Sequence, residues 1–315
     1  MRKVIGIGET VFDIIFKNNQ PISATPGGST FNSIISIGRT GIPAEFISET
    51  GEDRVGRRIM DFLEENGVSA RSIFVHKGQK SALSLAFLNE NNDAEYAFYK
   101  DHANDRLDFV YPEVNPDDIV IFGSFYAINP VVRDQVRAFL QYASQQGAIL
   151  YYDVNFRASH KGDAQKVLPN ICENLEFADV VRGSNEDFKI LFDLSDVDEI
   201  YRSQISKYVH HFIYTCGAEP AVLRSGNTLC KSYPVSPVRT VSTIGAGDSF
   251  NAGVACGLIQ NHITRDQLHQ GLDESLWDAL FALAQAFSAD VCQSFENYIS
   301  REFAKEMAAR ICLGK

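Results

Sequence analysis

Short apolar segments alternate with amphipathic segments along most of this chain. Val4–Gly8 and Ala44–Ser48 are short and apolar, as buried strands are, whereas the segment from Gly51 to Gly67 has apolar residues at helical spacing. A repeated order of strand and helix favours a parallel sheet with helices on its faces. The same patterns predict strands at Ile119–Phe122, Ile149–Tyr152, Ala178–Val181 and His211–Thr215, and helices at 30–39, 130–146, 277–292 and 303–311.

The alternation stops between Ser81 and Lys100, where two strand-like segments are joined by a polar loop with no helix between them. Together with Val11–Phe16, they are expected to form a small sheet that stands apart from the main one. Such a sheet can act as a lid that excludes water from a reacting phosphoryl group. We therefore expect one domain, residues 1–315, with a lid formed by about residues 11–26 and 81–101.

The charge and the cysteines narrow the possible partners and the compartment. The formal net charge is -11, and a surface this acidic repels the phosphate backbone of nucleic acids, so nucleic-acid binding is not expected. No apolar stretch is long enough to span a membrane, and the apolar start is too short for a signal peptide. None of the six cysteines lies in a Cys-x-x-Cys pair, which favours a reduced, cytoplasmic protein with buried thiols.

The segment Gly245-Ala246-Gly247-Asp248 precedes an apolar segment that is expected to be helical. The free N–H groups and the positive end of the helix dipole would there point the same way, which makes an anion-binding site. A carboxylate fits such a site if Asp248 takes the proton of a hydroxyl group while the backbone holds the phosphoryl group that this hydroxyl attacks. The alternative is an ordinary turn in which Asp248 caps the helix.

The pair Gly27-Gly28 precedes another predicted helix, which Ser29 or the next residue caps. Paired glycines allow close approach to the backbone, and the Asn32 amide can both donate to and accept from a sugar hydroxyl. A capped helix with a solvated asparagine is the alternative. Asp13 lies inside an apolar strand, where it is either an exposed edge residue or a carboxylate that binds polyol hydroxyls.

Two further polar segments follow predicted strands. Asp153–Arg157 lies just beyond the carboxyl end of a buried strand, where ligands bind in open α/β sheets. Arg157 can stabilise charge on a transferring phosphoryl group, or it can be a surface arginine. The acids of Ser184–Asp187 can hold the water shell of Mg2+, although such residues also cap helices.

Pro26-Gly27-Gly28 with Asn32 near the start, and Gly245–Asp248 near the end, together resemble the two motifs of the ribokinase-like (PfkB-type) carbohydrate kinases. The residues of these motifs are most similar to those of fructokinases, and the resemblance covers essentially the whole chain. It implies a three-layer α/β/α sandwich with a mostly parallel central sheet and a small β-sheet lid. It also implies Mg2+-dependent transfer of the ATP γ-phosphoryl group to a sugar hydroxyl.

The resemblance also implies roles for single residues. The catalytic positions of the family correspond to Asp248, Arg157, Gly245, Ala246 and Gly247. Its sugar-binding positions correspond to Asp13, Gly27, Gly28, Asn32 and Asn155. Its cofactor-binding positions correspond to Ser184, Thr215, Gly217 and Gln285, and its metal ligand corresponds to Asp187.

Three sites in the sequence, one of them a dipeptide, depart from the family's pattern. Asp187 is shorter than the glutamate that is usual near the metal. Ser242 stands where an acid is common before the anion hole, which argues against activation by a monovalent cation such as K+. Thr30-Phe31 replaces smaller residues after the paired glycines, which narrows the sugar pocket.

The sequence therefore predicts a cytoplasmic ATP-dependent sugar kinase, most similar to fructokinases, that converts D-fructose to fructose 6-phosphate with ATP and Mg2+. Ribokinase, 2-keto-3-deoxygluconate kinase and nucleoside kinase remain alternatives within the family. A catalytically silent sugar-binding sensor is an alternative from another class, against which the retained Gly-Ala-Gly-Asp segment argues. The exposed edges of a lid sheet predict a homodimer formed through the lid.

Overall fold

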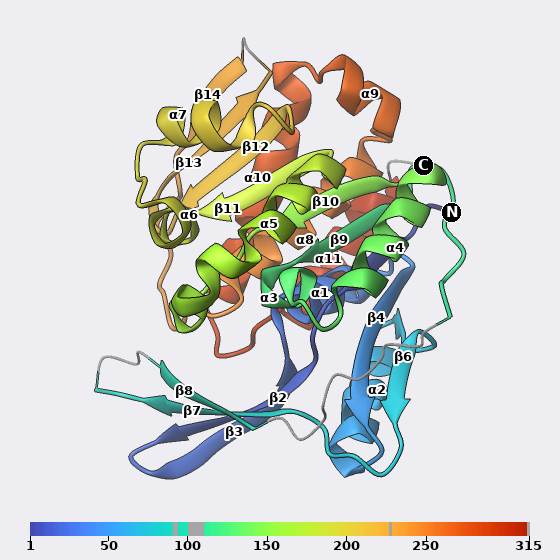
Figure 1. Ribbon diagram of the computed structural model, residues 1–315, viewed down its shortest axis with the longest axis vertical. Coiled ribbons are helices and arrows are strands. Elements are labelled where there is room, and N and C mark those ends of the chain that lie inside the picture. Colours follow the sequence, from blue (N-terminus) through green and yellow to red (C-terminus); the bar gives the residue numbers. More distant parts are fainter. Residues whose placement is uncertain (91–93, 100–109, 227–228, 314–315) are drawn as a thin grey trace.

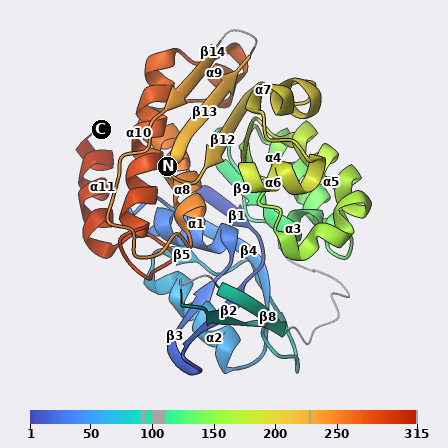
Figure 2. The ribbon, with the colours of Figure 1, turned by 90° about the vertical axis from the view of Figure 1, so that its left-hand side faces the viewer.

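The computed structural model describes residues 1–90, 94–99, 110–226 and 229–313. A large sheet runs through the centre with helices on both faces, and a smaller sheet projects from one end (Figures 1 and 2). The strands of the large sheet are β1 (Val4–Ile7), β4 (Ala44–Gly51), β5 (Val68–Ser69), β6 (Ile73–His76), β9 (Ile119–Gly123), β10 (Ile149–Asp153), β11 (Val180–Ser184), β12 (His211–Cys216), β13 (Glu219–Ser225) and β14 (Leu229–Tyr233). Their order is β14-β13-β12-β11-β10-β9-β1-β4-β5, and β6 pairs with β4. The predicted α/β architecture is confirmed.

The large sheet is buried on both faces, as parallel sheets are. It is parallel as far as β12, and β13 and β14 extend it antiparallel. In β9, Ile119 and Ile121 join one core cluster, whereas Val120 and Phe122 join the other. The continuous apolar runs of the sequence therefore come from strands with two buried faces.

Each face of the sheet has its own layer of helices (Figure 2). One layer contains α1 (Ser29–Arg39), α2 (Arg54–Glu65), α8 (Ala246–Gln260), α9 (Arg265–Gln270), α10 (Glu274–Val291) and α11 (Arg301–Leu313). The other contains α3 (Ser124–Ile128), α4 (Arg133–Gln145), α5 (Ala164–Phe177), α6 (Asn185–Phe192) and α7 (Val197–Ile200), with short helical turns at Ala158–Asp163 and Tyr201–Ile205. In the described part of the chain, no helix is both long and apolar enough to cross a membrane.

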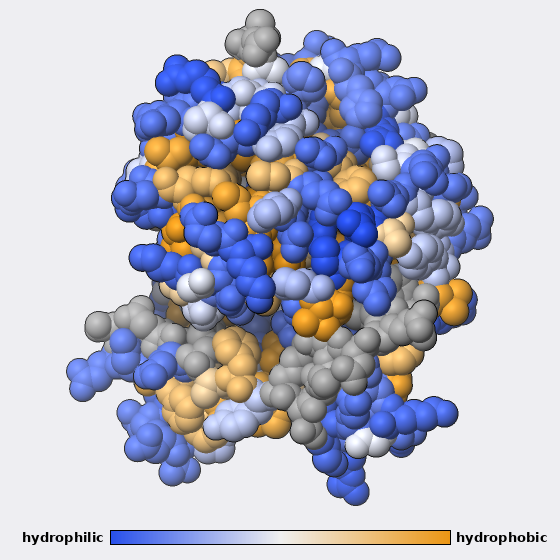
Figure 3. Space-filling model, in the orientation of Figure 1, coloured by the Kyte–Doolittle hydropathy of each residue, from blue (hydrophilic) through white to orange (hydrophobic). Residues whose placement is uncertain are grey.

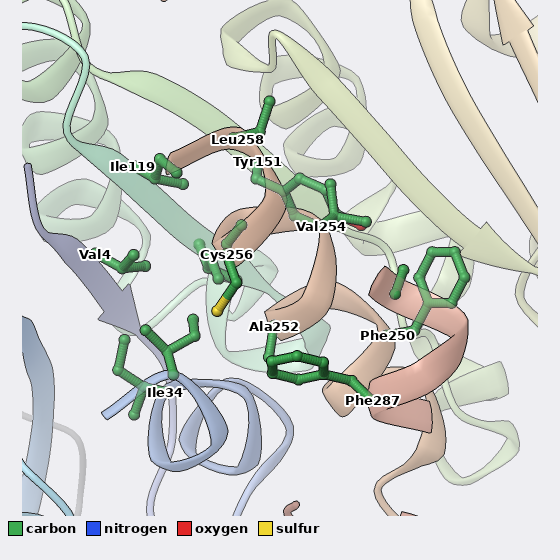
Figure 4. Packing of buried hydrophobic residues seen from close by; sticks show 14 of the residues in the cluster. Val4, Ile34, Ile119, Tyr151, Phe250, Ala252, Val254, Cys256, Leu258 and Phe287 are labelled. Atoms are coloured by element: carbon green, nitrogen blue, oxygen red, sulfur yellow. The ribbon is translucent and has the colours of Figure 1, made fainter. Parts of the chain in front are cut away.

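Helix α8 lies at the centre of its layer, packed against the sheet, α1 and α10. Figure 4 shows Val254, Cys256 and Leu258 of α8 among side chains of β1, β9 and α1. A Cβ at Gly253 would lie 2.5 Å from the Cα of Ala284 in α10, so the close crossing of these two helices requires glycine. Because α8 is enclosed on three sides, its first turn has a fixed place above the sheet.

The small sheet has the strand order β3-β2-β7-β8 and stands away from the main sheet (Figure 1). Its strands are β2 (Val11–Lys17), β3 (Gln20–Gly27), β7 (Leu83–Leu88) and β8 (Ala94–Tyr99). The sequence patterns predict no strand at β3, whose two prolines suit an edge position because proline cannot donate to a ladder. Of the lid range predicted at 81–101, residues 91–93, 100 and 101 lie outside the described residues.

Some predicted helix boundaries are wrong. Helix α1 is capped by Gly28, not by Ser29 or Thr30, because Ser29 is already helical and its hydroxyl is used elsewhere. The helix predicted at 130–146 begins at Arg133, and the separate helix α3 precedes it. Both errors lie at element ends, and at α1 the cause is the tertiary partner of Ser29.

Candidate active site

Two glycine-containing turns, one before α1 and one before α8, meet in the structure. Asp248 in the first turn of α8 accepts hydrogen bonds from the Ser29 hydroxyl at 2.9 Å and from the Asn32 side-chain amide at 2.8 Å. The Ser33 hydroxyl donates to the backbone carbonyl of Asp248 at 2.8 Å. Asn32 and Asp248 are thus direct partners, although 216 positions separate them in the sequence.

The Asp248 carboxyl group is buried, with 7% of the residue exposed. Burial raises the pKa of Asp248 to about 6, although the hydrogen bond from Asn32, the positive charge of Arg157 and the hydrogen bond from Ser29 lower it. Such a carboxyl group is ionised at neutral pH, yet it holds a proton more tightly than an exposed aspartate does. It is therefore suited to take a proton from a hydroxyl group.

The backbone at the start of α8 leaves donors free. Gly245 caps the helix with a φ of +79°, and a Cβ there would lie 2.2 Å from the carbonyl oxygen of Asn297, so glycine is required. The Ala246 N–H donates to the Thr243 carbonyl at 3.2 Å, whereas no described residue accepts from the N–H groups of the two residues that follow. Free N–H groups at a helix N-terminus can hold an anion.

The paired glycines before α1 allow the Asp13 side chain and the Glu9 backbone carbonyl to lie close to this turn. A Cβ at Gly27 would lie 2.3 Å from Oδ2 of Asp13, and a Cβ at Gly28 would lie 2.3 Å from the carbonyl oxygen of Glu9. Burial raises the pKa of Asp13 to about 6. The side-chain oxygen of Asn32 is buried, with no partner among the residues that the structure describes. Asp13 and Asn32 therefore both offer acceptors to ligand hydroxyl groups.

A buried polar network lies beside the first turn of α8, and the sequence patterns do not predict it. The Arg182 guanidinium of β11 donates to Asp153 at 3.0 Å and to Thr215 at 2.6 Å. The Asn251 amide donates to the other Asp153 oxygen at 2.8 Å and accepts from the Tyr151 hydroxyl at 3.0 Å. One signal for this network is present in the sequence, because an arginine is rare inside an apolar strand.

The segment after β10 makes a turn that is tied to α6. Asn155 has a φ of +35°, and Arg157 is exposed. The backbone N–H groups of Phe156 and Ser184 donate to the two oxygens of Asp187 at 2.7 and 2.6 Å. Asp187 as a metal ligand stays a prediction. Among the described residues, no group of three or more His, Cys, Asp or Glu side chains is arranged to hold a metal ion.

The predicted nucleotide-side residues lie in two places. Thr215 is the last residue but one of β12 and lies beside Arg182, and Gly217, just beyond the strand, has a φ of +56°. Gln285 on α10 instead donates to the Pro234 carbonyl at 2.9 Å. The structure therefore joins Thr215 to the buried network and joins Gln285 to the segment after β14.

Both the sequence and the fold of this chain are similar to those of known proteins. The model of the pfkB family carbohydrate kinases matches residues 1–302. Among curated proteins, the probable fructokinase-4 of Arabidopsis thaliana is 27% identical over 84% of this chain and 80% of its own length. Fructokinase-2 of Solanum lycopersicum is 27% identical over 71% of this chain and 70% of its own.

Solved structures show the same fold at lower sequence identity. The fructokinase of Vibrio cholerae O395, solved with fructose, ADP and calcium ion bound, matches with a TM-score of 0.80 and 20% identity over 94% of each chain. The aminoimidazole riboside kinase of Salmonella enterica matches with a TM-score of 0.78 and 20% identity over 98% of this chain and 100% of its own. The fold is therefore that of the ribokinase-like proteins.

Proposed function

The chain belongs to the pfkB family of carbohydrate kinases, and we propose that it is a fructokinase, which transfers the γ-phosphoryl group of ATP to D-fructose and yields fructose 6-phosphate. The observation that carries this proposal is the buried Asp248 carboxylate, held by Ser29 and Asn32 in the first turn of α8. The curated fructokinases at 27% identity support the choice of sugar.

In the proposed reaction, Asp248 takes the proton of the attacking primary hydroxyl group as the new O–P bond forms. The bond between the γ-phosphorus and the ADP oxygen breaks, and ADP leaves with its electron pair. The free N–H groups in the first turn of α8 stabilise the negative charge of the transferring group, and Arg157 adds a positive charge. Each of these residues acts without forming a covalent bond to the substrate.

The remaining predicted residues have binding roles in this proposal. Asp13, Asn32 and Asn155 bind the sugar hydroxyls beside the turn made by the paired glycines. ATP enters as its magnesium complex, with Thr215 and Gly217 on the nucleotide side. The free thiols of the described cysteines are consistent with the proposed cytoplasmic location.

A coupled assay of ADP release tests the proposal. The panel contains D-fructose, D-ribose, 2-keto-3-deoxygluconate and adenosine, and we expect the highest kcat/KM with D-fructose. A higher value with another acceptor would refute the choice of sugar and leave the kinase assignment in place. Sugar binding by calorimetry without any ADP release would refute the enzyme assignment and favour a sugar sensor.

The rate is expected to fall at acid pH. Asp248 acts as a base only when ionised, so with a pKa of about 6 we expect kcat/KM to be level above about pH 7 and to fall about tenfold per pH unit below about pH 6. Asp13 titrates in the same range. The profile of Asp13→Asn separates the two groups, because the fall caused by Asp248 persists in it. A flat profile for that variant between about pH 5 and 8 would contradict the base role of Asp248.

We also propose that two copies associate through the small sheet. The strand register places a mainly apolar set on one face of this sheet, namely Ile14, Phe16, Leu83, Leu85, Phe87, Ala97 and Tyr99. The same face also carries Glu95, opposite Phe87, and Phe12, which packs against the main core. Phe87 is 40% exposed and Tyr99 is 58% exposed. Figure 3 shows apolar residues on the surface of the small sheet. Apolar side chains gathered on an exposed face mark a site of association.

Light scattering after size-exclusion chromatography tests this association. We expect the mass of a dimer for the parent protein and the mass of a monomer for Phe87→Glu, because the glutamate places a charge within the apolar face. Val131→Glu, at an exposed apolar position before α4, is the matched control and should remain dimeric. A monomeric parent protein at assay concentration would refute the proposal.

A further inference from the structure

The segment of residues 296–299, between α10 and α11, lies against both glycine-containing turns. A Cβ at Gly245 would lie 2.2 Å from the carbonyl oxygen of Asn297, and a Cβ at Gly27 would lie 3.8 Å from the side-chain nitrogen of the same asparagine. Asn297 is buried, with 4% of the residue exposed. A single residue therefore lies between the turn before α8 and the turn before α1.

The next residue, Tyr298, is tied to the small sheet. Its hydroxyl group shares a hydrogen bond of 2.7 Å with the hydroxyl group of Thr25 in β3. The strand register places Thr25 directly opposite Asp13, and the chain reaches Gly27 two positions later. Because Tyr298 is buried, this hydrogen bond joins the sugar side of the site to the interior of the molecule.

The ring of Tyr298 and the backbone beside it are held by α1 and α2. The Arg39 guanidinium lies 4.5 Å from the centre of the Tyr298 ring, and the Phe62 ring lies 5.4 Å from it, centre to centre. Arg39 also donates to the carbonyl oxygen of Ile299, and the Ser36 hydroxyl accepts from the N–H group of Ile299 at 3.2 Å. With so many contacts, the segment of residues 296–299 moves as a unit.

We propose that Tyr298 is a positioning residue that couples the binding of the sugar to the binding of the nucleotide. Because Tyr298 and Asn297 are adjacent, a ligand that fixes β3 also fixes the turn at Gly245, so the second ligand has less ordering to do. Each ligand then strengthens the binding of the other by the same factor. This inference rests on the proposed kinase function. The contrasting explanation is that Tyr298 only fills the core beside Phe62.

Calorimetric titration of the sugar without and with saturating MgADP measures this coupling. The sugar is the best acceptor of the assay panel, which we expect to be D-fructose, and the coupling factor is the ratio of its two dissociation constants. We expect a factor of about 5 to 150 for the parent protein, the usual range of coupling between two sites. Tyr298→Phe keeps the ring against Arg39 and Phe62 and loses only the hydroxyl group, so it should lower this factor by about 2- to 10-fold, the usual effect of one hydrogen bond.

Thr25→Val removes the other half of the hydrogen bond and tests whether the two side chains act together. It should lower the factor as much as Tyr298→Phe does, and the double variant should lower it no further. Tyr201→Phe is the matched control and should keep the factor of the parent. Tyr201 is also buried, stacks on Phe212 and donates its hydroxyl hydrogen to backbone carbonyls, but it lies at the amino end of β12, away from both turns.

A parent factor close to 1, an unchanged factor in Tyr298→Phe, or a larger loss in the double variant than in either single one would overturn the inference and leave the kinase assignment intact. A parent protein that binds neither the sugar nor MgADP would instead refute the proposed function, and with it this inference. If Tyr298→Phe does not fold in a thermal melt, Thr25→Val decides, because Thr25 is only half-buried on an edge strand. In that variant, a lowered factor supports the coupling, and an unchanged one refutes it.

Discussion

Replacing Asp248 with asparagine is expected to lower kcat by about 10²–10⁴-fold, the usual contribution of a general base. Asparagine has nearly the same shape, and its side chain can still form hydrogen bonds with Ser29 and Asn32, so the sugar should bind with little change in affinity. Steady-state kinetics and calorimetric titration with D-fructose measure the two effects separately. A kcat close to that of the parent would remove Asp248 from the role of base.

The same variant has an expected effect on stability that a structural role would not produce. The pKa of Asp248 is raised in the folded protein, so its contribution to stability is present at acid pH and is lost as the pH rises through about 6. At about pH 8 the buried charge is therefore unfavourable, and Asp248→Asn should unfold at a temperature no lower than the parent does. Asp118→Asn is the control, because Asp118 is buried and holds backbone N–H groups of Lys3 and Asn115; it should lose stability and keep kcat.

Replacing Gly245 with alanine is expected to lower kcat by about 10²–10³-fold, the cost of losing one backbone donor to a developing negative charge. The new Cβ would meet the Asn297 carbonyl oxygen at 2.2 Å, so the turn must shift and carry its free N–H groups away from the phosphoryl group. The left-handed backbone at this position adds a cost of about 1–2 kcal/mol for a residue with a Cβ. Activity assays and chemical denaturation measure the two effects.

The variant Gly41→Ala separates the effect of left-handed backbone strain from the effect of displacing the first turn of α8. Gly41 has a φ of +81°, close to the +79° of Gly245, but a Cβ there has nothing within 4 Å. This variant should therefore lose about 1–2 kcal/mol of stability and keep its kcat. Equal activity losses in the two variants would contradict the view that the first turn of α8 must be accurately placed.

The sequence allows the fold to be predicted because most strands of the large sheet are short apolar segments, whereas several of the helices between them are amphipathic. The sequence also assigns the glycine pair, Asn32 and Asp248 to one predicted active site. The structure places Asn32 and Asp248 in contact. Their assigned roles stay predictions, as do those of Arg157 and the nucleotide-side residues. The sequence most directly reveals the two glycine-containing turns before α1 and α8, because their backbone geometry depends on glycine.

The buried network is the part that sequence patterns do not predict. Arg182 pairs with Asp153, 29 positions before it, and with Thr215, 33 positions after it. Each partner lies on a neighbouring parallel strand, so the contact depends on the register between strands, and no short motif encodes it. The cap of α1 is missed for a related reason, because the Ser29 hydroxyl binds Asp248 of a distant helix and leaves the capping position to Gly28.

The hydrogen bonds that join α1 to Asp248 span 215 to 219 positions of the chain, and the backbone around Asn297 closes against Gly245. On the ribosome, α1 emerges long before α8, so the first helix must wait for most of the protein to be synthesised before it can complete its contacts. A nascent chain that stops short of α8 has no carboxylate to bind Ser29 and Asn32. In the mechanism proposed above, phosphoryl transfer therefore requires that the chain has been synthesised at least through the first turn of α8.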